Sequence, residues 1–252
     1  MQADDWIIIP ARYQATRLPG KPLLRIGDKP MICHVLDRAR ESGFEHIVVA
    51  TDDERVQEAV HEHGGRAILT SEGHESGSDR LAEVADFLDL PDEAVVINLQ
   101  GDEPLMPPVL LNQVAQLLRD HPEASMATLM VPIIDRTEFH NPDVVKVVAN
   151  NQGQALYFSR SPIPHHRDEH IGTGGDIDMF GFRHLGLYAY RAGFLRRFVA
   201  TPSPEIERFE KLEQLRALAM GALIAIDIAE QTPATGVDTE HDLERVRTLL
   251  LD

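Results

Sequence analysis

The first half of the chain alternates short apolar runs with stretches of helical periodicity. Trp6 to Ile9 and Ala94 to Leu99 are nearly continuous apolar runs, as expected of central parallel strands covered on both faces. Between such runs apolar residues recur every three or four positions, as in the stripe that begins at Met31 and that Gly43 can end. Further strands are predicted at 47–50 and 68–69, and further helices around 56–60, 81–88 and 110–118. Repeated strand–helix units imply right-handed crossovers, so the pattern predicts an α/β fold with a doubly wound, mostly parallel sheet.

The pattern changes after about residue 125 and becomes richer in strands. Residues 144–149 and 155–158 flank Asn150-Asn151-Gln152-Gly153, which is typical of a hairpin. The stretch 162–182 has little periodicity and is predicted to be a long loop. Strands are expected at 126–134, 184–190 and 223–228, and helices near 192–200, 207–220 and at the end of the chain. Because no repeat or low-complexity linker interrupts the chain, we expect a single domain, 1–252, with a β-hairpin and loop insertion at about 134–183.

Composition narrows the range of partners. Of 252 residues 43% are hydrophobic, and the formal net charge is -17, which disfavours binding to nucleic acid and to anionic lipid. No apolar run reaches membrane-span length and the first residues lack a basic signal region, so we expect a cytoplasmic protein with no membrane insertion. The single cysteine, Cys33, permits no intrachain disulfide, and its place in a helical stripe favours packing over catalysis.

A basic loop follows the first predicted strand. Arg12, Arg17 and Lys21 lie within ten residues of one another, and Gly20 and two prolines shape the loop. Ligands of open α/β sheets bind outside the carboxyl ends of strands, where loop N–H groups and basic side chains can hold phosphate. Neither the Walker spacing nor the dinucleotide glycine pattern is present. The residues alone leave two interpretations open: an anion site, or solvated charges on an acidic surface.

Two carboxylates are candidates for a metal site. Asp102 lies in the turn Gln100-Gly101-Asp102-Glu103 after a central strand, where it could hold Mg²⁺ against a phosphate or cap the turn. Asp238 precedes the last predicted helix, next to a Thr239–Asp242 capping box, and by itself would be a helix-entry residue.

Other candidate residues have equally simple structural alternatives. Ser76-Gly77 could approach a base edge or begin a helix with Ser78 as its cap. Arg80 could be an i,i+3 partner of Glu83. His184 and Tyr188 stand four apart on a predicted strand and so share one face. Glu213 and Gln214 are expected to face a cleft from a helix whose apolar positions are Phe209, Leu212, Leu215 and Ala219. The loop histidines His165, His166 and His170 are expected to be exposed, because no histidine spacing suggests zinc.

The segment from Pro10 to Leu23 resembles the nucleotide-binding signature of the 3-deoxy-manno-octulosonate cytidylyltransferases, or CMP-Kdo synthetases. The similarity continues through 29–32 and 48–52 and covers nearly the whole chain. Ala15 departs from it, since the family usually has Ser there, and we leave Ala15 out of the site. The resemblance implies a Rossmann-like nucleotidyltransferase fold whose insertion makes a homodimer contact.

The resemblance also implies the site residues. Asp102 and Asp238 would hold Mg²⁺ and, with Arg12 and Lys21, would form the catalytic set. The nucleotide would contact Pro10, Ala11, Arg12, Lys21, Ser76, Gly77, Arg80 and Gln100. The sugar would contact Arg17, Gln100, Arg160, His184, Tyr188, Glu213 and Gln214.

The implied reaction uses CTP to activate 3-deoxy-D-manno-octulosonate (Kdo), giving CMP-Kdo and pyrophosphate for lipopolysaccharide biosynthesis. The sequence leaves open the same reaction on 8-amino-Kdo or a sialic acid. A nucleotide-binding regulatory module without turnover is a further alternative, and the presence of Arg12, Lys21, Asp102 and Asp238 together argues against it.

Overall fold

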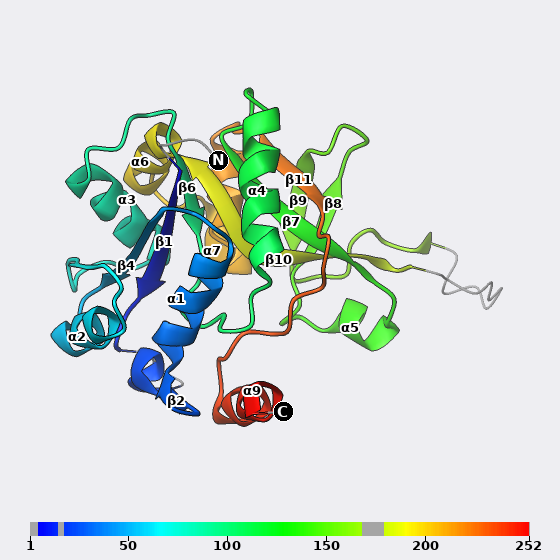
Figure 1. The fold of residues 1–252 in the computed structure, drawn as a ribbon. Helices are drawn as coiled ribbons and strands as arrows, with labels where there is room; N and C mark the ends of the chain where they lie inside the picture. Colours follow the sequence, from blue (N-terminus) through cyan, green and yellow to red (C-terminus); the bar gives the residue numbers. More distant parts are fainter. Residues whose placement is uncertain (1–4, 15–17, 168–178, 252) are drawn as a thin grey trace.

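The structure, a computed structural model, describes residues 5–14, 18–167 and 179–251. It consists of a central sheet with helices on both faces, and a hairpin arm that extends to one side (Figure 1). The strands are β1 (Trp6–Ala11), β2 (Arg25–Ile26), β3 (Lys29–Pro30), β4 (His46–Thr51), β5 (Ala67–Leu69), β6 (Val95–Asn98), β7 (Met126–Ile133), β8 (Lys146–Ala149), β9 (Ala155–Ser159), β10 (Gly181–Arg191) and β11 (Ile224–Ile228). The helices are the 3-10 turn η1 (Lys21–Leu23), α1 (Met31–Glu41), α2 (Glu54–Glu62), α3 (Gly77–Phe87), α4 (Pro108–Asp120), α5 (Arg136–His140), α6 (Ala192–Ala200), α7 (Glu205–Glu210), α8 (Gln214–Ala219) and α9 (Glu240–Leu251).

The sheet is doubly wound and mostly parallel, as predicted. Its strand order is β11-β7-β10-β6-β1-β4-β5. β1 pairs in parallel with β4 and β6, β4 with β5, and β11 with β7. β10 is antiparallel to β6, to β7 and to β8 of the hairpin arm. The carboxyl ends of β1, β4 and β6 therefore meet at one edge, where ligands of such sheets bind.

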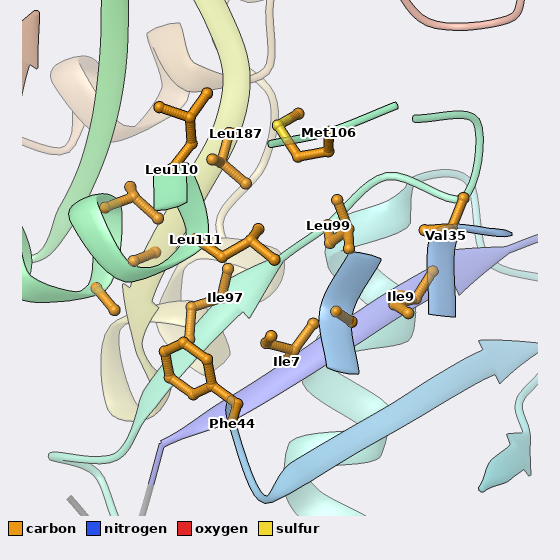
Figure 2. Close-up of a cluster of buried hydrophobic side chains, with 14 of the residues drawn as sticks. Ile7, Ile9, Val35, Phe44, Ile97, Leu99, Met106, Leu110, Leu111 and Leu187 are labelled. Carbon is orange, nitrogen blue, oxygen red and sulfur yellow. The ribbon is translucent and has the colours of Figure 1, made fainter. Parts of the chain in front are cut away.

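Two apolar layers hold the helices against the sheet. On one face Val35 of α1 and Leu111 of α4 pack against Ile7, Ile97 and neighbouring side chains (Figure 2). On the other face α3, α6 and α8 pack on Ile8, Val96 and Tyr190. Because the strands are covered on both sides, consecutive residues such as Ile7, Ile8 and Ile9 are all fully buried.

A third, smaller cluster joins the last helix to the N-terminal region. Leu243 and Val246 of α9 pack with Ile26, Met31 and Val237. An extended segment runs from β11 to α9, which lies beside β2 at the lower edge of the molecule (Figure 1). The residues just before α9 are thereby held near the loop that follows β1.

The hairpin predicted around Asn150–Gly153 is present as β8 and β9, which pair antiparallel. Two other predictions were wrong in detail. β10 begins at Gly181, so the loop ends before Phe182. The helix predicted over 207–220 is two helices, α7 and α8, because Lys211 adopts a left-handed conformation (φ 55°) that ends α7. No helix among the described residues has the length and apolar character needed to cross a bilayer.

Candidate active site

A cleft of about 350 Å³ opens at the carboxyl edge of the sheet. Its walls come from the end of β1, the turn after β6, the start of α3 and the segment before α9. All eight residues of the predicted nucleotide set line it, together with both predicted metal ligands: Pro10, Ala11, Arg12, Lys21, Ser76, Gly77, Arg80, Gln100, Asp102 and Asp238. Their sequence separation reaches more than 200 residues, so the fold alone brings them together.

Lys21 joins the two predicted metal ligands. Its Nζ donates to Asp102 Oδ2 at 2.6 Å, to the Val237 carbonyl at 3.0 Å and to Asp238 Oδ1 at 3.2 Å. Three oxygens from two distant segments thus converge on one cationic nitrogen. Such an all-oxygen donor set is the kind that Mg²⁺ prefers. The side chain of Asp102 serves this cluster, and the interpretation that it caps its own turn is wrong.

The backbone around the two carboxylates is closely packed. A Cβ on Gly101 would lie 2.7 Å from the Pro10 carbonyl oxygen, so only glycine lets the turn after β6 approach the end of β1. The Val237 N–H donates to the Asp102 carbonyl at 2.8 Å, which attaches the segment before α9 to the same turn. The Thr239–Asp242 capping box is confirmed, with the Asp242 N–H donating to Thr239 Oγ1 at 3.3 Å.

Excess negative charge surrounds this cluster. Burial, reinforced by the nearby Asp102 and Asp238, raises the pKa of Glu103 to about 8. Glu103 is therefore mostly protonated at neutral pH, but the two aspartates still outnumber the one lysine between them, which makes the position favourable for a further cation. Among the described residues no group of three or more histidine, cysteine or acidic side chains is arranged to hold a metal ion. A cation bound here would take its other ligands from substrate and water.

Arg80 lines the cleft, but its partners differ from the one considered in the sequence. Its Nη2 donates to Asp52 at the end of β4, and its Nη1 donates to Thr70 Oγ1 at 2.6 Å. Glu83 instead accepts from the Ser71 N–H and contacts His74, so the i,i+3 pairing is wrong. The other Asp52 oxygen accepts the Tyr13 N–H at 3.0 Å. Arg80 is 3% exposed and connects α3 to the loop after β1 through Asp52.

The N-cap of α3 is Ser76, and the prediction of Ser78 as the cap was wrong. The Ser76 hydroxyl accepts the Asp79 N–H at 3.2 Å, and the Asp79 carboxylate in turn accepts the Ser76 N–H at 2.9 Å. Ser78 is buried in the first turn and donates to Glu213 Oε2 at 3.0 Å. The start of α3 is thereby joined to the start of α8.

His184 and Tyr188 lie side by side, with ring centroids 5.2 Å apart. A bulge between Leu185 and Tyr188 shifts the register of β10 against β7 by two residues. Because side chains alternate between the two faces of a strand, this even shift keeps His184 and Tyr188 on the same face, as predicted. Thr128 Oγ1 lies 3.0 Å from His184 Nε2 and 2.8 Å from the Leu187 carbonyl oxygen. Burial lowers the pKa of His184 to about 3, so the imidazole is neutral at physiological pH. Because the single hydroxyl hydrogen of Thr128 is donated to the carbonyl, Thr128 Oγ1 can only accept from His184 Nε2, which must carry the ring hydrogen. Nδ1 of the neutral His184 ring is then a hydrogen-bond acceptor.

Of the rest of the predicted sugar set, Gln100 lines the first cleft, whereas Arg160, Glu213 and Gln214 do not. The Phe158 ring packs edge-on against His184 at 4.9 Å, and Arg160 follows two residues later. Gln100 donates to Asn98 at 3.2 Å, and Asn98 pairs with Tyr188 across the sheet. Glu213 lines a neighbouring groove with Ser76, whereas Gln214 is buried and does not face a cleft freely as expected. Arg17 and Ala15 lie outside the described residues.

The remaining chemical candidates have structural roles. Cys33 is buried in α1, and burial raises the pKa of its thiol to about 11, which agrees with a packing role. His165 is exposed as expected, but His166 is half-buried between Phe139 and Phe180. His170 lies outside the described residues.

Sequence reasoning did not identify the contacts that Asp52, Glu103 and Ser78 make in the site. Asp52 could have been found, because it follows β4, and β4 ends at the same sheet edge as β1 and β6. Nothing in the sequence marks Ser78 as a partner of Glu213, since 135 residues separate them.

Comparison with known proteins agrees with this geometry. Residues 6–227 match the cytidylyltransferase family. The chain is similar to the 3-deoxy-manno-octulosonate cytidylyltransferase of Nitrosococcus oceani, with 51% identity over 97% of this chain and 96% of the relative. It is similar to the protein of the same name from Hahella chejuensis, with 53% identity over the same shares. A solved structure described as CMP:2-keto-3-deoxy-manno-octonic acid synthetase complexed with CTP superposes with a TM-score of 0.90 and 44% identity, covering 99% of both chains.

Proposed function

Because the chain belongs to the cytidylyltransferase family, and within it to the 3-deoxy-manno-octulosonate cytidylyltransferases, we propose roles for its site residues in that reaction. The enzyme transfers a cytidylyl group from CTP to Kdo and releases pyrophosphate. The product, CMP-Kdo, serves lipopolysaccharide biosynthesis. The observation that carries the assignment of roles is the convergence of Asp102, Asp238 and Lys21 beside Arg12 in the first cleft.

The 2-hydroxyl of Kdo attacks the α-phosphorus of CTP in line, and the bond to the pyrophosphate oxygen breaks. Arg12 and Lys21 supply positive charge where the leaving pyrophosphate gathers negative charge. Arg12 is exposed in the cleft and has no ion pair with another described residue, so its guanidinium is available to phosphate. Catalysis then consists of positioning and electrostatic stabilisation, and no covalent enzyme intermediate is needed.

Asp102 and Asp238 would hold Mg²⁺, for which their convergence on one cationic position and the excess of two carboxylates over one lysine are suitable. The bound ion would reduce the charge on the α-phosphate and favour the alkoxide form of the attacking hydroxyl. The two aspartates come from the turn after β6 and the segment before α9. The metal site is therefore complete only when α9 is docked.

The sugar acid would lie against His184, Tyr188, Arg160 and Glu213, next to Gln100. A neutral His184 with a free Nδ1 accepts a hydroxyl hydrogen, and Arg160 meets negative charge. Ser76 and Gly77 at the start of α3 would face the cytosine. A cytoplasmic homodimer that uses the 134–183 insertion as its contact is part of the same proposal, and its mass in solution tests it.

The test is release of pyrophosphate from CTP and Kdo with Mg²⁺, in the wild type and in Asp102→Ala. We expect release by the wild type and a fall of about a thousandfold or more in the variant. The matched control is Glu58→Ala, which removes an exposed carboxylate from α2, outside the cleft and the insertion. Undiminished release by Asp102→Ala would rule out the metal role. Absence of release by the wild type with any divalent cation would rule out the proposed roles altogether.

A further inference from the structure

We propose that Glu210 is a positioning residue for the sugar acid, because it holds Arg160 against the end of α7. The inference rests on the proposed function, in which Arg160 contacts Kdo. Glu210 is the last residue of α7 and belongs to none of the predicted site sets.

Glu210 contacts the end of β9 with both its side chain and its backbone. Its carboxylate accepts the Ser159 hydroxyl at 2.6 Å and the Arg160 N–H at 2.9 Å. Its carbonyl oxygen accepts Arg160 Nε at 2.7 Å. One residue therefore orients both the backbone and the guanidinium of Arg160.

Two further contacts complete the arrangement. Lys146 is fully buried, and its Nζ donates to the Arg160 carbonyl at 2.6 Å and to the Asn141 carbonyl at 2.8 Å. Arg160 Nη1 donates to the Pro142 carbonyl at 3.0 Å. With Nε and one Nη1 hydrogen used, the Nη2 hydrogens and the second Nη1 hydrogen remain for a ligand. Arg160 is thus oriented to meet an anion with the outer end of its guanidinium.

The position of Glu210 in the chain connects this cluster to the rest of the sugar site. Lys211 ends α7 in a left-handed conformation, and Glu213, which accepts from Ser78, follows two residues later. Arg160 follows Phe158, whose ring packs against His184. Glu210 therefore sets the distance between the hairpin arm and the helix start that carries Glu213.

The experiment measures KM for Kdo and for CTP in Glu210→Ala, Glu210→Gln and Ser159→Ala. The control is Glu205→Ala, an exposed carboxylate on the same helix. Loss of two charge-assisted hydrogen bonds predicts a rise in KM for Kdo of about tenfold to a hundredfold in Glu210→Ala, with KM for CTP within about twofold. Glu210→Gln keeps an acceptor for the Arg160 N–H and should recover most of the loss. Ser159→Ala removes one contact and should have a smaller effect of the same kind.

Amide hydrogen exchange provides a readout that does not depend on turnover. Exchange of the Arg160 N–H should accelerate in Glu210→Ala and remain unchanged in Glu205→Ala. An unchanged KM for Kdo, a parallel rise in both KM values, or unchanged exchange at Arg160 would each overturn the inference. Failure of the proposed function would appear instead as absence of pyrophosphate release by the wild type, and the exchange measurement would then decide the positioning role alone.

Discussion

Removing the Arg80 guanidinium should destabilise the protein and loosen the loop after β1. Arg80 is 3% exposed, and the Asp52 side chain with which it pairs is 12% exposed. In Arg80→Met, Asp52 keeps the Tyr13 N–H as its one hydrogen-bond donor among the described residues, and the Ser71 carbonyl loses the donor that lies 3.2 Å away. Thr70 is less affected, since its hydroxyl still donates to the Thr51 carbonyl.

The size of the effect follows from burial. Breaking a buried ion pair by removing one partner costs about 3–5 kcal/mol, because the remaining charge is left unpaired. The Tyr13 N–H still stabilises Asp52, so we expect the lower end of this range, about 3 kcal/mol. For a chain of this size that corresponds to a fall of roughly 10 °C in Tm. KM for CTP should rise as well, since Arg80 itself lines the nucleotide cleft and Asp52, which accepts the Tyr13 N–H beside Arg12, is no longer held in place by Arg80.

Urea denaturation of wild type, Arg80→Met, Asp52→Asn and the double variant measures the pair directly. The double variant should cost less than the sum of the single variants by roughly 2 kcal/mol, because it leaves neither charge unpaired. A loss below about 1 kcal/mol in Arg80→Met, or strict additivity, would refute the reasoning. The Arg80–Asp52 ion pair would then contribute as little to stability as an exposed pair, and the role of Arg80 would be limited to contact with the nucleotide.

Two other changes test the close packing and the buried histidine. Gly101→Ala places a Cβ 2.7 Å from the Pro10 carbonyl oxygen and should cost about 1–3 kcal/mol of unfolding free energy and most of the activity. Gly186→Ala, whose added Cβ has no atom of the described residues within 4 Å, should leave urea stability and turnover nearly unchanged, and equal effects of the two changes would contradict the packing argument. His184 has its pKa lowered from 6.5 to about 3 in the folded state, so its contribution to stability is complete above pH 6.5 and is lost as the pH falls toward 3. Between pH 7.5 and pH 5 the free energy of unfolding of His184→Gln should therefore fall by about 2 kcal/mol less than that of the wild type, as measured by denaturation curves at each pH. Equal falls in the two proteins would show that His184 is protonated in the folded protein.

The elements that were predictable are those whose own residues carry the pattern. Ile7, Ile8 and Ile9 indicate a strand covered on both sides wherever it lies in the sheet, and the stripe from Met31 to Ala39 faces the core as its period requires. The prediction of one helix over 207–220 was wrong because Phe209 and Leu212 fit a helical stripe. In the structure Phe209 is 80% exposed, whereas Leu212 packs into the core. Periodicity cannot distinguish a core residue from an exposed apolar one when the backbone turns between them.

The location of the site was predictable, because ligands of such sheets bind at the carboxyl ends of the strands. The nucleotide set follows three parallel strands to one edge of the sheet, and it lines one cleft. The contacts of individual polar side chains were not predictable, since they join elements far apart in the sequence. Pairing with Glu83 on its own helix was one interpretation considered for Arg80, but Arg80 pairs with Asp52, which follows β4. A local pairing rule considers only partners on the same helix, and this ion pair is made by the tertiary fold.

The second carboxylate of the proposed metal site depends on a part of the molecule separate from the main core. Asp238 follows Val237, which is fully buried with Leu243 and Val246 of α9 against Ile26 and Met31. The two large clusters contain none of these residues. The Val237 N–H also donates to the Asp102 carbonyl, so the docking of α9 places Asp238 beside Asp102. Both carboxylates then lie within reach of the Lys21 ammonium group. The small cluster therefore controls the distance between the two carboxylates, and through it the proposed metal site, whereas the sheet and its two main layers control the shape of the nucleotide cleft.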